Sequence, residues 1–421
     1  MFYGWYVVGC AFLVALWGWG LGFYGPSIYL VALQQAHAWS TATVSMAITA
    51  YYLMGALVIV FVGDALRRVG APRTISGGVV AMAAGVAALT WVDRPWQLYP
   101  AFALMAVGWA GMSVAAINII VAPWFERRRG AAVSLALTGA SCGGVFVAPA
   151  LLGFIERVGF EEAVRGAVLV MGATVLPVVG VVLRRSPSER GLLPDGDPAR
   201  SPSSPARAEP SRPAAPRRSG ALRTGRYWTI TIAFSLGLAG QVGILMHLVA
   251  YVSPLLGVGA AGAALSLTTL AAVVGRFPVG ALADRMDRRI VACLNFLFEV
   301  AGLSLLLIAT SAPLVYAGCV LFGLGVGNMI SLPALLVQRE FPPEQFAGLV
   351  SLIMATGQFT LALAPGVIGV LRDVTGGYEA ALAMCVALEL AGALVIVLGR
   401  ASARDRLEAL PNPVGGGEMS T

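Results

Sequence analysis

An arginine in the middle of an apolar stretch is the residue with the clearest capacity for ligand chemistry. Arg276 lies in the apolar run 261–283, and a cation inside a membrane-spanning helix costs at least about 2.5–3.5 kcal/mol, so it needs a compensating role. It precedes Asp284 by eight residues, which places it about 12 Å from that end of a helix. Because a guanidinium binds a carboxylate through two parallel hydrogen bonds, Arg276 predicts a site for a small organic anion. The alternative role is a structural ion pair with Glu299 or Glu389.

Other polar side chains within apolar runs could complete such a site. Five of them could bind a hydroxyl or keto oxygen, namely Tyr24, Asn118, Gln241, Asn328 and Gln358. Hydrogen bonding between helices is the alternative role for each of these five. Three further residues could carry a proton, because histidine titrates near pH ~6.5 and a carboxyl group screened from water favours its neutral form. These proton-coupling candidates are His247, Glu299 and Glu389, and His247 is also a candidate for binding the substrate.

The composition requires most of the chain to be buried in lipid. Of the 421 residues, 58% are hydrophobic and 12% are charged, against about 45–50% and about 25% in soluble domains. A helix needs about 20 residues to cross a bilayer. We therefore predict an all-α polytopic membrane protein with twelve transmembrane helices, at residues 6–33, 41–62, 74–92, 97–123, 130–155, 164–183, 227–256, 261–283, 290–310, 313–338, 345–371 and 378–400.

The apolar runs form two groups of six, separated by a segment of different composition. The segment 184–226 contains eight prolines, ten arginines and no apolar periodicity, which is typical of a disordered linker. The predicted organisation is an N-terminal six-helix bundle (1–183), this basic cytoplasmic linker, a C-terminal six-helix bundle (227–400) and a cytoplasmic tail (401–421). The first apolar run is too long for the core of a cleavable signal peptide, so we expect it to be retained.

The distribution of arginines indicates the orientation. All 28 basic residues are arginine. Assigned to alternate loops, 23 lie on the side of the linker and the tail, Arg276 lies within a span, and four lie on the other side, namely Arg94, Arg157, Arg165 and Arg372. Because an excess of basic residues marks the cytoplasmic side, we expect both termini in the cytoplasm. The excess of arginines on the cytoplasmic side of the bilayer then explains the net charge of +7. We therefore expect no nucleic-acid partner.

Enzymatic, metal and nucleotide chemistry have few residues to support them. The five cysteines fall in apolar runs without a paired spacing, and His37 and His247 are far apart in the sequence. Since the chain has no lysine, it has no phosphate-binding loop of the Gly-x-x-x-x-Gly-Lys type. We therefore expect no metal, no cofactor and no enzymatic activity.

The two halves resemble each other at a separation of about 217 residues. Gly63–Arg68 corresponds to Gly280–Arg285, and Val133–Pro149 corresponds to Val350–Pro365. Parallel repeats with a ligand site near the membrane midplane between them characterise one large transporter architecture.

The loop after the second helix of each half resembles the Gly-x-x-x-Asp-Arg-x-Gly-Arg-Arg signature of the major facilitator superfamily. The second copy fits this signature, whereas the first copy has Arg67 where aspartate is expected. The resemblance implies two halves that rock against each other, and a cytoplasmic gate in which a carboxylate at a helix end faces arginines. The alternative is simple anchoring of the loops at the cytoplasmic surface. The predicted gate residues are Gly63, Arg67, Arg68, Gly280, Asp284, Arg285 and Arg289.

A closer resemblance, to the bacterial monocarboxylate transporter and oxalate:formate antiporter-like family, spans both halves. It rests on short segments in this order: Gly4–Tyr6, Trp39–Ser40, Trp124–Gly130, His247–Tyr251, Gly275–Arg276 and Arg372–Gly376. The resemblance implies that Arg276 binds the substrate carboxylate. Ala272 stands where some relatives have a proton-carrying aspartate, so that role would pass to His247, Glu299 or Glu389. The seventh helix lines the cavity in this architecture, so His247 ranks first, with a packed core histidine as the alternative.

These features predict secondary active transport of a small monocarboxylate by alternating access, with proton coupling, in the bacterial inner (plasma) membrane. One cation favours a substrate with one carboxylate, and we expect a monomer in the lipid bilayer. A proton-driven exporter of amphipathic compounds, favoured by the run Gly144-x-x-x-Ala148-Pro149-x-x-x-Gly153, or an organic-anion exchanger is the alternative. A third possibility is a non-transporting sensor whose linker recruits a partner, although the linker lacks an amphipathic or aromatic recognition pattern.

Overall fold

The computed structural model describes residues 2–184, 187, 189, 192–196 and 220–408, apart from the side chains of Asp284 and of residues 400–408. Within these residues the chain is almost entirely helical and has no strand. Most of the predicted linker and the tail after Glu408 lie outside the described residues. At the edges of the linker, two short 3-10 turns are described, η7 (Pro194–Gly196) and η8 (Ala221–Arg223).

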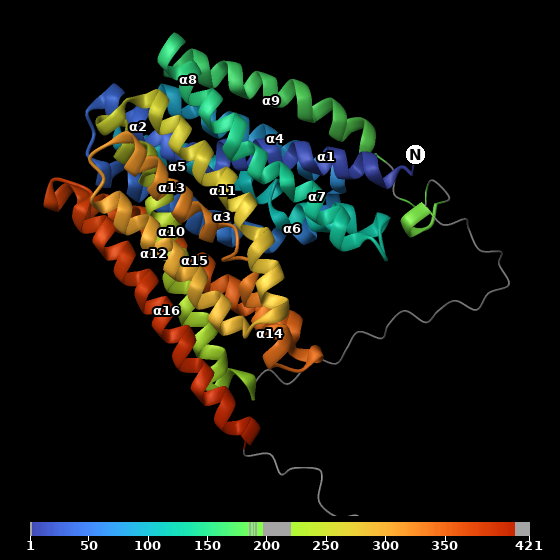
Figure 1. The fold of residues 1–421 in the computed structure, drawn as a ribbon. Coiled ribbons are helices and arrows are strands. Elements are labelled where there is room, and N and C mark those ends of the chain that lie inside the picture. Colours follow the sequence, from blue (N-terminus) through green and yellow to red (C-terminus); the bar gives the residue numbers. More distant parts are fainter. Residues whose placement is uncertain (1, 185–186, 188, 190–191, 197–219, 409–421) are drawn as a thin grey trace, which may run out of the picture.

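The N-terminal half contains six helical passes, several of which are interrupted (Figure 1). In chain order they are α1 (Gly4–Trp17), the π-helical turn η1 (Gly18–Phe23) and α2 (Gly25–His37); α3 (Thr41–Val69); α4 (Ala71–Ala88) and η2 (Leu89–Trp91); η3 (Pro95–Gln97), α5 (Leu98–Gly111), α6 (Val114–Val121) and η4 (Ala122–Trp124); α7 (Arg129–Cys142), the π-helical turn η5 (Gly143–Val147) and α8 (Ala148–Val158); and α9 (Phe160–Val182).

The C-terminal half repeats this order with six more passes (Figure 1). They are α10 (Gly225–Leu256); α11 (Val258–Arg285); α12 (Arg288–Leu307); α13 (Ala312–Val326) and α14 (Leu332–Glu340); η9 (Pro343–Gln345) and α15 (Phe346–Thr375); and α16 (Glu379–Glu408). The predicted boundary at residue 400 therefore falls inside α16, which continues as a helix to Glu408.

Length and composition make these passes suitable for a membrane. Eleven helical segments of the described chain are long and apolar enough to cross a bilayer, and α13 is a shorter apolar helix that completes the second six. The predicted fold class is therefore confirmed. The continuous span predicted over 313–338 is wrong, because α13 ends at Val326 and the chain turns before α14 begins. The turn is stabilised by Asn328, whose Nδ2 donates to the carbonyl oxygen of Leu324 at 3.0 Å.

Single glycines reverse the chain between some neighbouring passes. Gly70 separates α3 from α4, and Gly257 separates α10 from α11, both with φ of +90°. Side chains with a Cβ rarely adopt this backbone conformation, so glycine permits a turn of one residue. Such short turns keep consecutive helices antiparallel and adjacent.

The two halves contact each other mainly through three helix pairs, α3 with α15, α2 with α10, and α8 with α11 (Figure 1). The hydrogen bonds between the halves lie toward one end of these helices. For example, Gly366 N donates to Thr49 Oγ1 at 2.9 Å, and Ser266 Oγ donates to the carbonyl oxygen of Val145 at 3.2 Å. We call this the closed end; it carries the turns 38–40 and 376–378. The opposite end, where the described chain meets the linker, is called the linker end.

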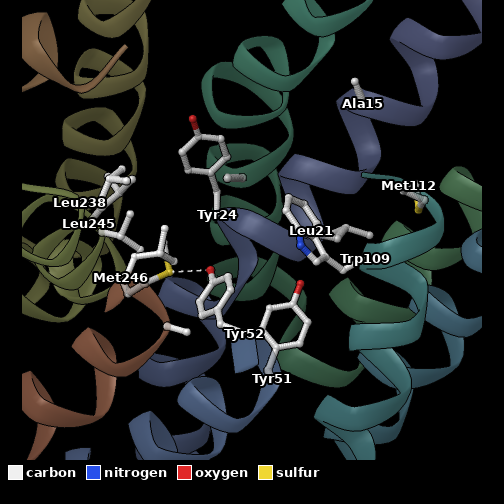
Figure 2. Close-up of a cluster of buried hydrophobic side chains, with 14 of the residues drawn as sticks. Ala15, Leu21, Tyr24, Tyr51, Tyr52, Trp109, Met112, Leu238, Leu245 and Met246 are labelled. Carbon is white, nitrogen blue, oxygen red and sulfur yellow. Dashed lines mark hydrogen bonds between the residues drawn. The ribbon is translucent and has the colours of Figure 1, made fainter. Parts of the chain in front are cut away.

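A buried aromatic cluster connects the interrupted first pass to the C-terminal half (Figure 2). Tyr51 and Tyr52 of α3 donate their hydroxyl groups to the carbonyl oxygens of Gly22 at 2.7 Å and Phe23 at 3.1 Å. These bonds satisfy polar backbone groups in the region of η1, which would be costly to leave unpaired inside lipid. Tyr52 also donates to Met246 Sδ of α10 at 3.0 Å.

Candidate functional site

Arg276 lies on α11 and has no carboxylate partner among the described side chains. Its side chain is exposed, and its Nε donates to the carbonyl oxygen of Gly327 at 3.2 Å. In the described part of the chain, no salt bridge joins Arg276 to an acidic residue; Glu299 and Glu389 are fully buried elsewhere in this half. The guanidinium therefore keeps further N–H donors for an anion.

Thr269 lies two turns before Arg276 on the same face of α11. At Thr269 this face meets the junction of the two halves. A Cβ built on Gly144 of η5 would lie 2.6 Å from Tyr24 Cε2 and 2.8 Å from Thr269 Oγ1, so glycine permits this close approach. The Tyr24 hydroxyl interacts with Thr269 and, electrostatically, with Arg276. The structure thus brings the predicted site residues Tyr24 and Arg276 into one region, and it adds Thr269, which the sequence did not single out.

Gln241 contributes a buried polar group to the same face of α10 as Leu238 and Leu245, which Figure 2 shows in the cluster with Tyr24. Its Oε1 has no hydrogen-bond partner among the described residues. A buried acceptor without a partner costs about 1–3 kcal/mol, so it marks either strain or a position completed by a ligand or water.

Asn118 and Gln358, the next predicted site residues, do not converge on Arg276 through any hydrogen bond. Asn118 Nδ2 donates to the carbonyl oxygen of Val114 at 2.9 Å, one turn earlier on α6. Gln358 is half-buried on α15. Their placement leaves Arg276, Tyr24 and Gln241 as the polar groups with the clearest capacity to hold a ligand.

Asn328 lies inside the C-terminal half, in a network of hydrogen bonds between helices. Its Nδ2 donates to Asn295 Oδ1 of α12 at 2.9 Å and to the carbonyl oxygen of Gly275 of α11 at 3.4 Å. Asn295 Nδ2 in turn donates to Glu299 Oε1 and to the carbonyl oxygen of Gly325, each at 3.2 Å. These are hydrogen bonds between helices, the alternative role given for Asn328 above.

Glu299 of α12 and Glu389 of α16 face each other in the interior of the C-terminal half. Both side chains are fully buried, and their carboxyl groups interact with each other. Glu299 Oε2 and both carboxyl oxygens of Glu389 have no hydrogen-bond partner among the described residues. The pair of Glu299 and Glu389 is separate from the Arg276 region. The hydrogen bonds through Asn295 and Asn328 connect the pair to the neighbourhood of Arg276.

His247 lies at the closed end rather than beside Arg276. Its Nδ1 is 3.1 Å from the hydroxyl oxygen of Tyr378, and its Nε2 is 3.0 Å from the carbonyl oxygen of Pro365 and 3.4 Å from Ser45 Oγ. Both ring nitrogens therefore have protein partners, and Ser45 is a residue of the other half.

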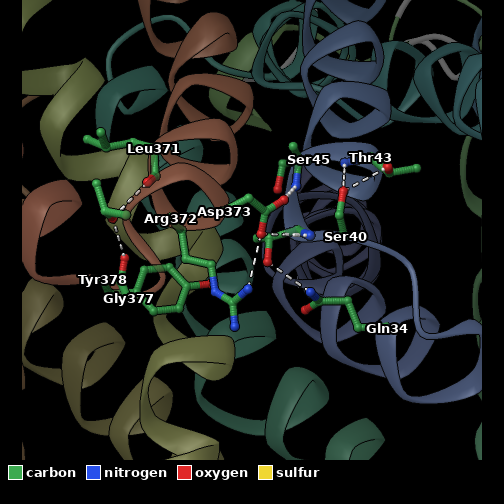
Figure 3. A network of polar contacts seen from close by, with 12 residues as sticks. Gln34, Ser40, Thr43, Ser45, Leu371, Arg372, Asp373, Gly377 and Tyr378 are labelled. Carbon is green, nitrogen blue, oxygen red and sulfur yellow. Dashed lines mark hydrogen bonds and ion pairs between the residues drawn. The ribbon is translucent and has the colours of Figure 1, made fainter.

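Asp373 forms the most extensive polar contact between the halves (Figure 3). Its carboxylate accepts hydrogen bonds from Ala42 N at 2.6 Å and Thr41 N at 3.3 Å, at the N-terminus of α3. Arg372 Nη1 donates to the same carboxylate at 3.0 Å. Because a helix N-terminus carries unpaired N–H groups and partial positive charge, an acidic side chain stabilises it. In the sequence this aspartate is distinguished only as part of the motif Arg372–Gly376, because nothing local indicates a partner more than 300 residues away.

The predicted gate residues of the first repeat lie at the linker end of α3. Gly63 is half-buried, and Arg68 is exposed. Arg67, which replaces the expected aspartate, pairs with Asp64 one turn earlier on the same helix, and both are exposed. This first copy therefore keeps a carboxylate beside its arginine, displaced by one turn.

The gate residues of the second repeat divide into two groups. Gly280 and Arg285 are exposed at the linker end of α11, and the Asp284 side chain lies outside the described residues. Arg289 is buried and binds Glu340 of α14 through two bonds, Nε to Oε1 at 2.7 Å and Nη2 to Oε2 at 2.8 Å. Since these partners belong to one half, Arg289 ties helices within the C-terminal bundle and makes no contact between the halves in this structure.

A described part of the linker docks on the N-terminal half through Asp195. The Asp195 carboxylate accepts hydrogen bonds from Arg127 N at 2.8 Å, Glu126 N at 3.1 Å and Arg128 N at 3.4 Å, just before α7. Desolvation opposes ionisation of this carboxyl, but the three N–H donors and the Arg127 guanidinium hold its pKa below the usual value. At least this part of the predicted linker is thus anchored.

The fold and these contacts define a class of protein, a membrane transporter built from two six-helix halves that meet at one end. Beside their junction lies an arginine that has no carboxylate partner in the described part of the chain. The family profile of the Major Facilitator Superfamily matches residues 8–265 and 256–414, and the chain belongs to this superfamily. The expected family and the absence of an enzymatic role agree with this match.

Named relatives include monocarboxylate transporters and an efflux protein. The chain is 30% identical over 363 residues to human monocarboxylate transporter 11, covering 80% of this chain and 70% of that protein. It is 27% identical over 360 residues to the Fujikurins efflux protein of Gibberella fujikuroi, again covering 80% and 70%. Among solved structures, a bacterial homolog of the human lysosomal transporter Spinster is similar with a TM-score of 0.67 at 14% identity, covering 98% of this chain and all of that one.

Proposed function

We propose that this transporter carries a small monocarboxylate across the bacterial inner membrane by alternating access, coupled to protons. The observation that supports this most is the Arg276 guanidinium, which lies beside the junction of the halves and has no carboxylate partner in the described chain. Inside a membrane protein an unpaired cation is expensive, so its retention favours an anionic ligand. The similarity to human monocarboxylate transporter 11 supports the same substrate class.

The substrate carboxylate would bind Arg276 through parallel hydrogen bonds, displacing the contact of Nε with the carbonyl oxygen of Gly327. Gln241, whose Oε1 lacks a partner, would accept a hydrogen bond from a hydroxyl group of the substrate. Tyr24 and Thr269 would close the site at the junction of the halves. Asn118 and Gln358 would line the path at its edges after small rotations of their side chains.

The orientation follows from the arginine count. With both termini in the cytoplasm, the closed end faces the periplasm, and the linker end faces the cytoplasm. The structure would then represent a state whose outer contacts, including Asp373 on α3 and Ser45 with His247, are formed. Transport requires these contacts to break while Gly63, Arg67, Arg68, Gly280, Asp284 and Arg285 come together as the cytoplasmic gate.

Uptake of labelled lactate, pyruvate and other short monocarboxylates into proteoliposomes tests this function. A charge-assisted hydrogen bond contributes about 1.5–3 kcal/mol, so Arg276→Gln should weaken apparent affinity by about 10- to 100-fold. Arg339→Gln removes an exposed arginine of α14 and is the control, with uptake near that of the unmodified protein. Saturable uptake that survives intact in Arg276→Gln would contradict the proposed role of this residue.

Export of amphipathic compounds is the second candidate function. It is favoured by the similarity to the Fujikurins efflux protein and by an apolar groove of about 810 Å³ against α1, α8 and α9, which Phe12, Trp17, Phe146 and Phe154 help to line. Expression in a host lacking its own efflux pumps distinguishes the two. Resistance to amphipathic toxicants without monocarboxylate uptake would favour export, and exchange of two organic anions without a proton requirement would favour an antiporter.

A further inference from the structure

The buried carboxyl groups of Glu299 and Glu389 have no role in the substrate site described above. They come from helices of the same half, and 90 residues separate them in the sequence. Neither forms a salt bridge in the described chain, and three of their four carboxyl oxygens accept no hydrogen bond from a described donor outside the pair. An isolated charge in such a place costs several kcal/mol or more, and two adjacent charges of the same sign cost more still. At least one proton must therefore reside on the pair.

Among the side chains that the structure describes, the elements packed around the pair bring no cation to it. From α10, Gly237 and Gly240 present backbone, because a Cβ on either would lie 3.1–3.2 Å from a Glu389 carboxyl oxygen. From α13, Gly325 packs directly against the Glu299 side chain. The titratable neighbour on α16 is Cys385, one turn from Glu389, whose thiol interacts with that carboxyl.

The same holds along α12. Its two basic residues have partners elsewhere, because Arg289 is bound to Glu340 and Arg288 Nη1 donates to the carbonyl oxygen of Leu335. The polar neighbour that reaches Glu299 is the uncharged Asn295. A proton is consequently the ion best able to neutralise the pair.

A continuous set of hydrogen bonds connects this pair to the helix segment that carries Arg276. Glu299 Oε1 accepts from Asn295 Nδ2 at 3.2 Å, and Asn295 Oδ1 accepts from Asn328 Nδ2 at 2.9 Å. Asn328 Nδ2 also donates to the carbonyl oxygen of Gly275, the residue before Arg276. Where α11 passes the end of α13, Arg276 Nε also donates to the carbonyl oxygen of Gly327, the residue before Asn328.

We infer that Glu299 and Glu389 form the proton-binding site that couples substrate movement to the proton gradient. A carboxylate bound to Arg276 would release the carbonyl oxygen of Gly327 and loosen the turn between α13 and α14. Because Gly325 and Asn328 of this region contact Glu299 and its partner Asn295, the change reaches the carboxyl pair. In each cycle one O–H bond forms on a carboxylate when a proton enters from one side, and the same bond breaks when the proton leaves on the other. This inference rests on the proposed transport of a monocarboxylate.

Glutamine substitutions test the inference with little change in shape. Glu299→Gln and Glu389→Gln remove the acid, and glutamine at 299 keeps an oxygen for Asn295 Nδ2. One proton per carboxylate supports about a 10-fold accumulation for each unit of pH gradient. We expect both variants to lose this accumulation while exchange of labelled for unlabelled substrate continues. Glu344→Gln, at an exposed carboxyl in η9, is the matched control and should accumulate substrate normally.

Infrared spectroscopy of the whole protein supplies a readout that does not depend on knowing the substrate. The unmodified protein should show the carbonyl band of a protonated carboxyl group at neutral pH, and each glutamine variant should lose intensity in it. Full gradient-driven accumulation by the double variant, or an unchanged band, would overturn the inference.

Failure of the inference and failure of the proposed function give different results. Saturable uptake through Arg276 that ignores the pH gradient would remove the coupling role and leave the substrate proposal standing. Absence of uptake for every monocarboxylate would remove the substrate proposal, and the infrared band would then decide by itself whether the pair binds a proton.

Discussion

At the scale of residues, two arginines of the C-terminal half differ in whether they find a carboxylate partner among the described residues. Arg289 is buried and has two bonds to a carboxylate, whereas Arg276 is exposed and has one bond to a backbone oxygen. The first arrangement holds helices together, and the second leaves a cation for a ligand. The same residue type therefore has a structural role at one position and supports a binding role at the other.

Replacing Arg276 by lysine tests whether geometry matters as well as charge. Lysine keeps the positive charge but lacks the planar fork that binds both carboxylate oxygens. We expect Arg276→Lys to retain saturable uptake with an apparent KM raised by about 10-fold, the equivalent of about 1.4 kcal/mol. Concentration-dependent uptake in proteoliposomes measures this, and a KM equal to that of the unmodified protein would show that charge alone suffices.

At the scale of elements, glycines set how closely helices of one half approach each other. Gly275 of α11 lies against the carbonyl oxygen of Leu324 of α13, and a Cβ there would overlap the backbone. Gly327 likewise faces the carbonyl oxygen of Ala272. The close crossing of α11 and α13 is what places Asn328 within reach of Gly275 and Arg276 beside Gly327.

Gly275→Ala should therefore destabilise the protein. Overpacking of this kind costs about 1–3 kcal/mol when the neighbour is backbone that cannot move aside. Thermal unfolding in detergent should show a lower midpoint for Gly275→Ala. On the same helix, a Cβ at Gly280 would meet nothing within 4 Å, so Gly280→Ala is the control for thermal stability. A midpoint for Gly275→Ala that matches this control would contradict the tight crossing.

The anchored part of the linker gives a pH-dependent prediction. The pKa of Asp195 is lower in the folded protein than in the unfolded chain. Its contribution to docking is therefore fully present at pH above the unfolded-chain pKa of about 3.9, and it is lost as the pH falls through the folded-state pKa. Amide exchange at Glu126, Arg127 and Arg128, corrected for intrinsic rates, should stay slow from neutral pH down to mildly acidic pH. Asp195→Asn should accelerate this exchange at neutral pH. Equal exchange in both proteins at neutral pH would mean that the carboxylate does not anchor the segment.

At the scale of the whole molecule, polar contacts at the closed end hold the two halves in one arrangement. Asp373 binds the start of α3, and His247 approaches Ser45, so both contacts span the two halves. Because alternating access requires this end to open, such contacts set part of the free-energy difference between the two states.

Asp373→Asn should shift the protein toward the state in which this end is open. An acidic side chain at a helix N-terminus contributes about 0.3–1 kcal/mol, which corresponds to a shift of about two- to fivefold in the population ratio. Spin labels at the exposed positions Gln35 and Glu379 report the separation of the halves as a distance distribution. Asp93→Asn, an exposed aspartate in the turn before η3, should leave the distribution unchanged. An unaltered distribution in Asp373→Asn would show that its contact does not stabilise the closed end.

Hydropathy and composition along the sequence determined the helical passes, the division into two halves and the unusual position of Arg276. These properties depend on residues close together in the chain, because a span is defined by about 20 consecutive apolar residues. The break between α13 and α14 was missed because a single apolar run was assigned across Gly327, Asn328 and Ser331, and the hydrogen bond of Asn328 that stabilises the turn is visible only in the structure. The composition of residues 184–226 predicts a linker. Its docking through Asp195 could not be predicted in this way, because it depends on N–H groups that lie about 67–69 residues earlier.

Only the tertiary structure decided which polar residues meet. Glu299 and Glu389 were separate candidates until α12 and α16 packed together, and Asp373 gained its role only when α15 met the start of α3. Asn328, a candidate either for ligand binding or for hydrogen bonds between helices, joins three helices of one half. Hydrophobic patterning places a residue inside the membrane, but it does not select its neighbours. Those follow from helix crossings, which depend on the shapes of side chains distant in the sequence.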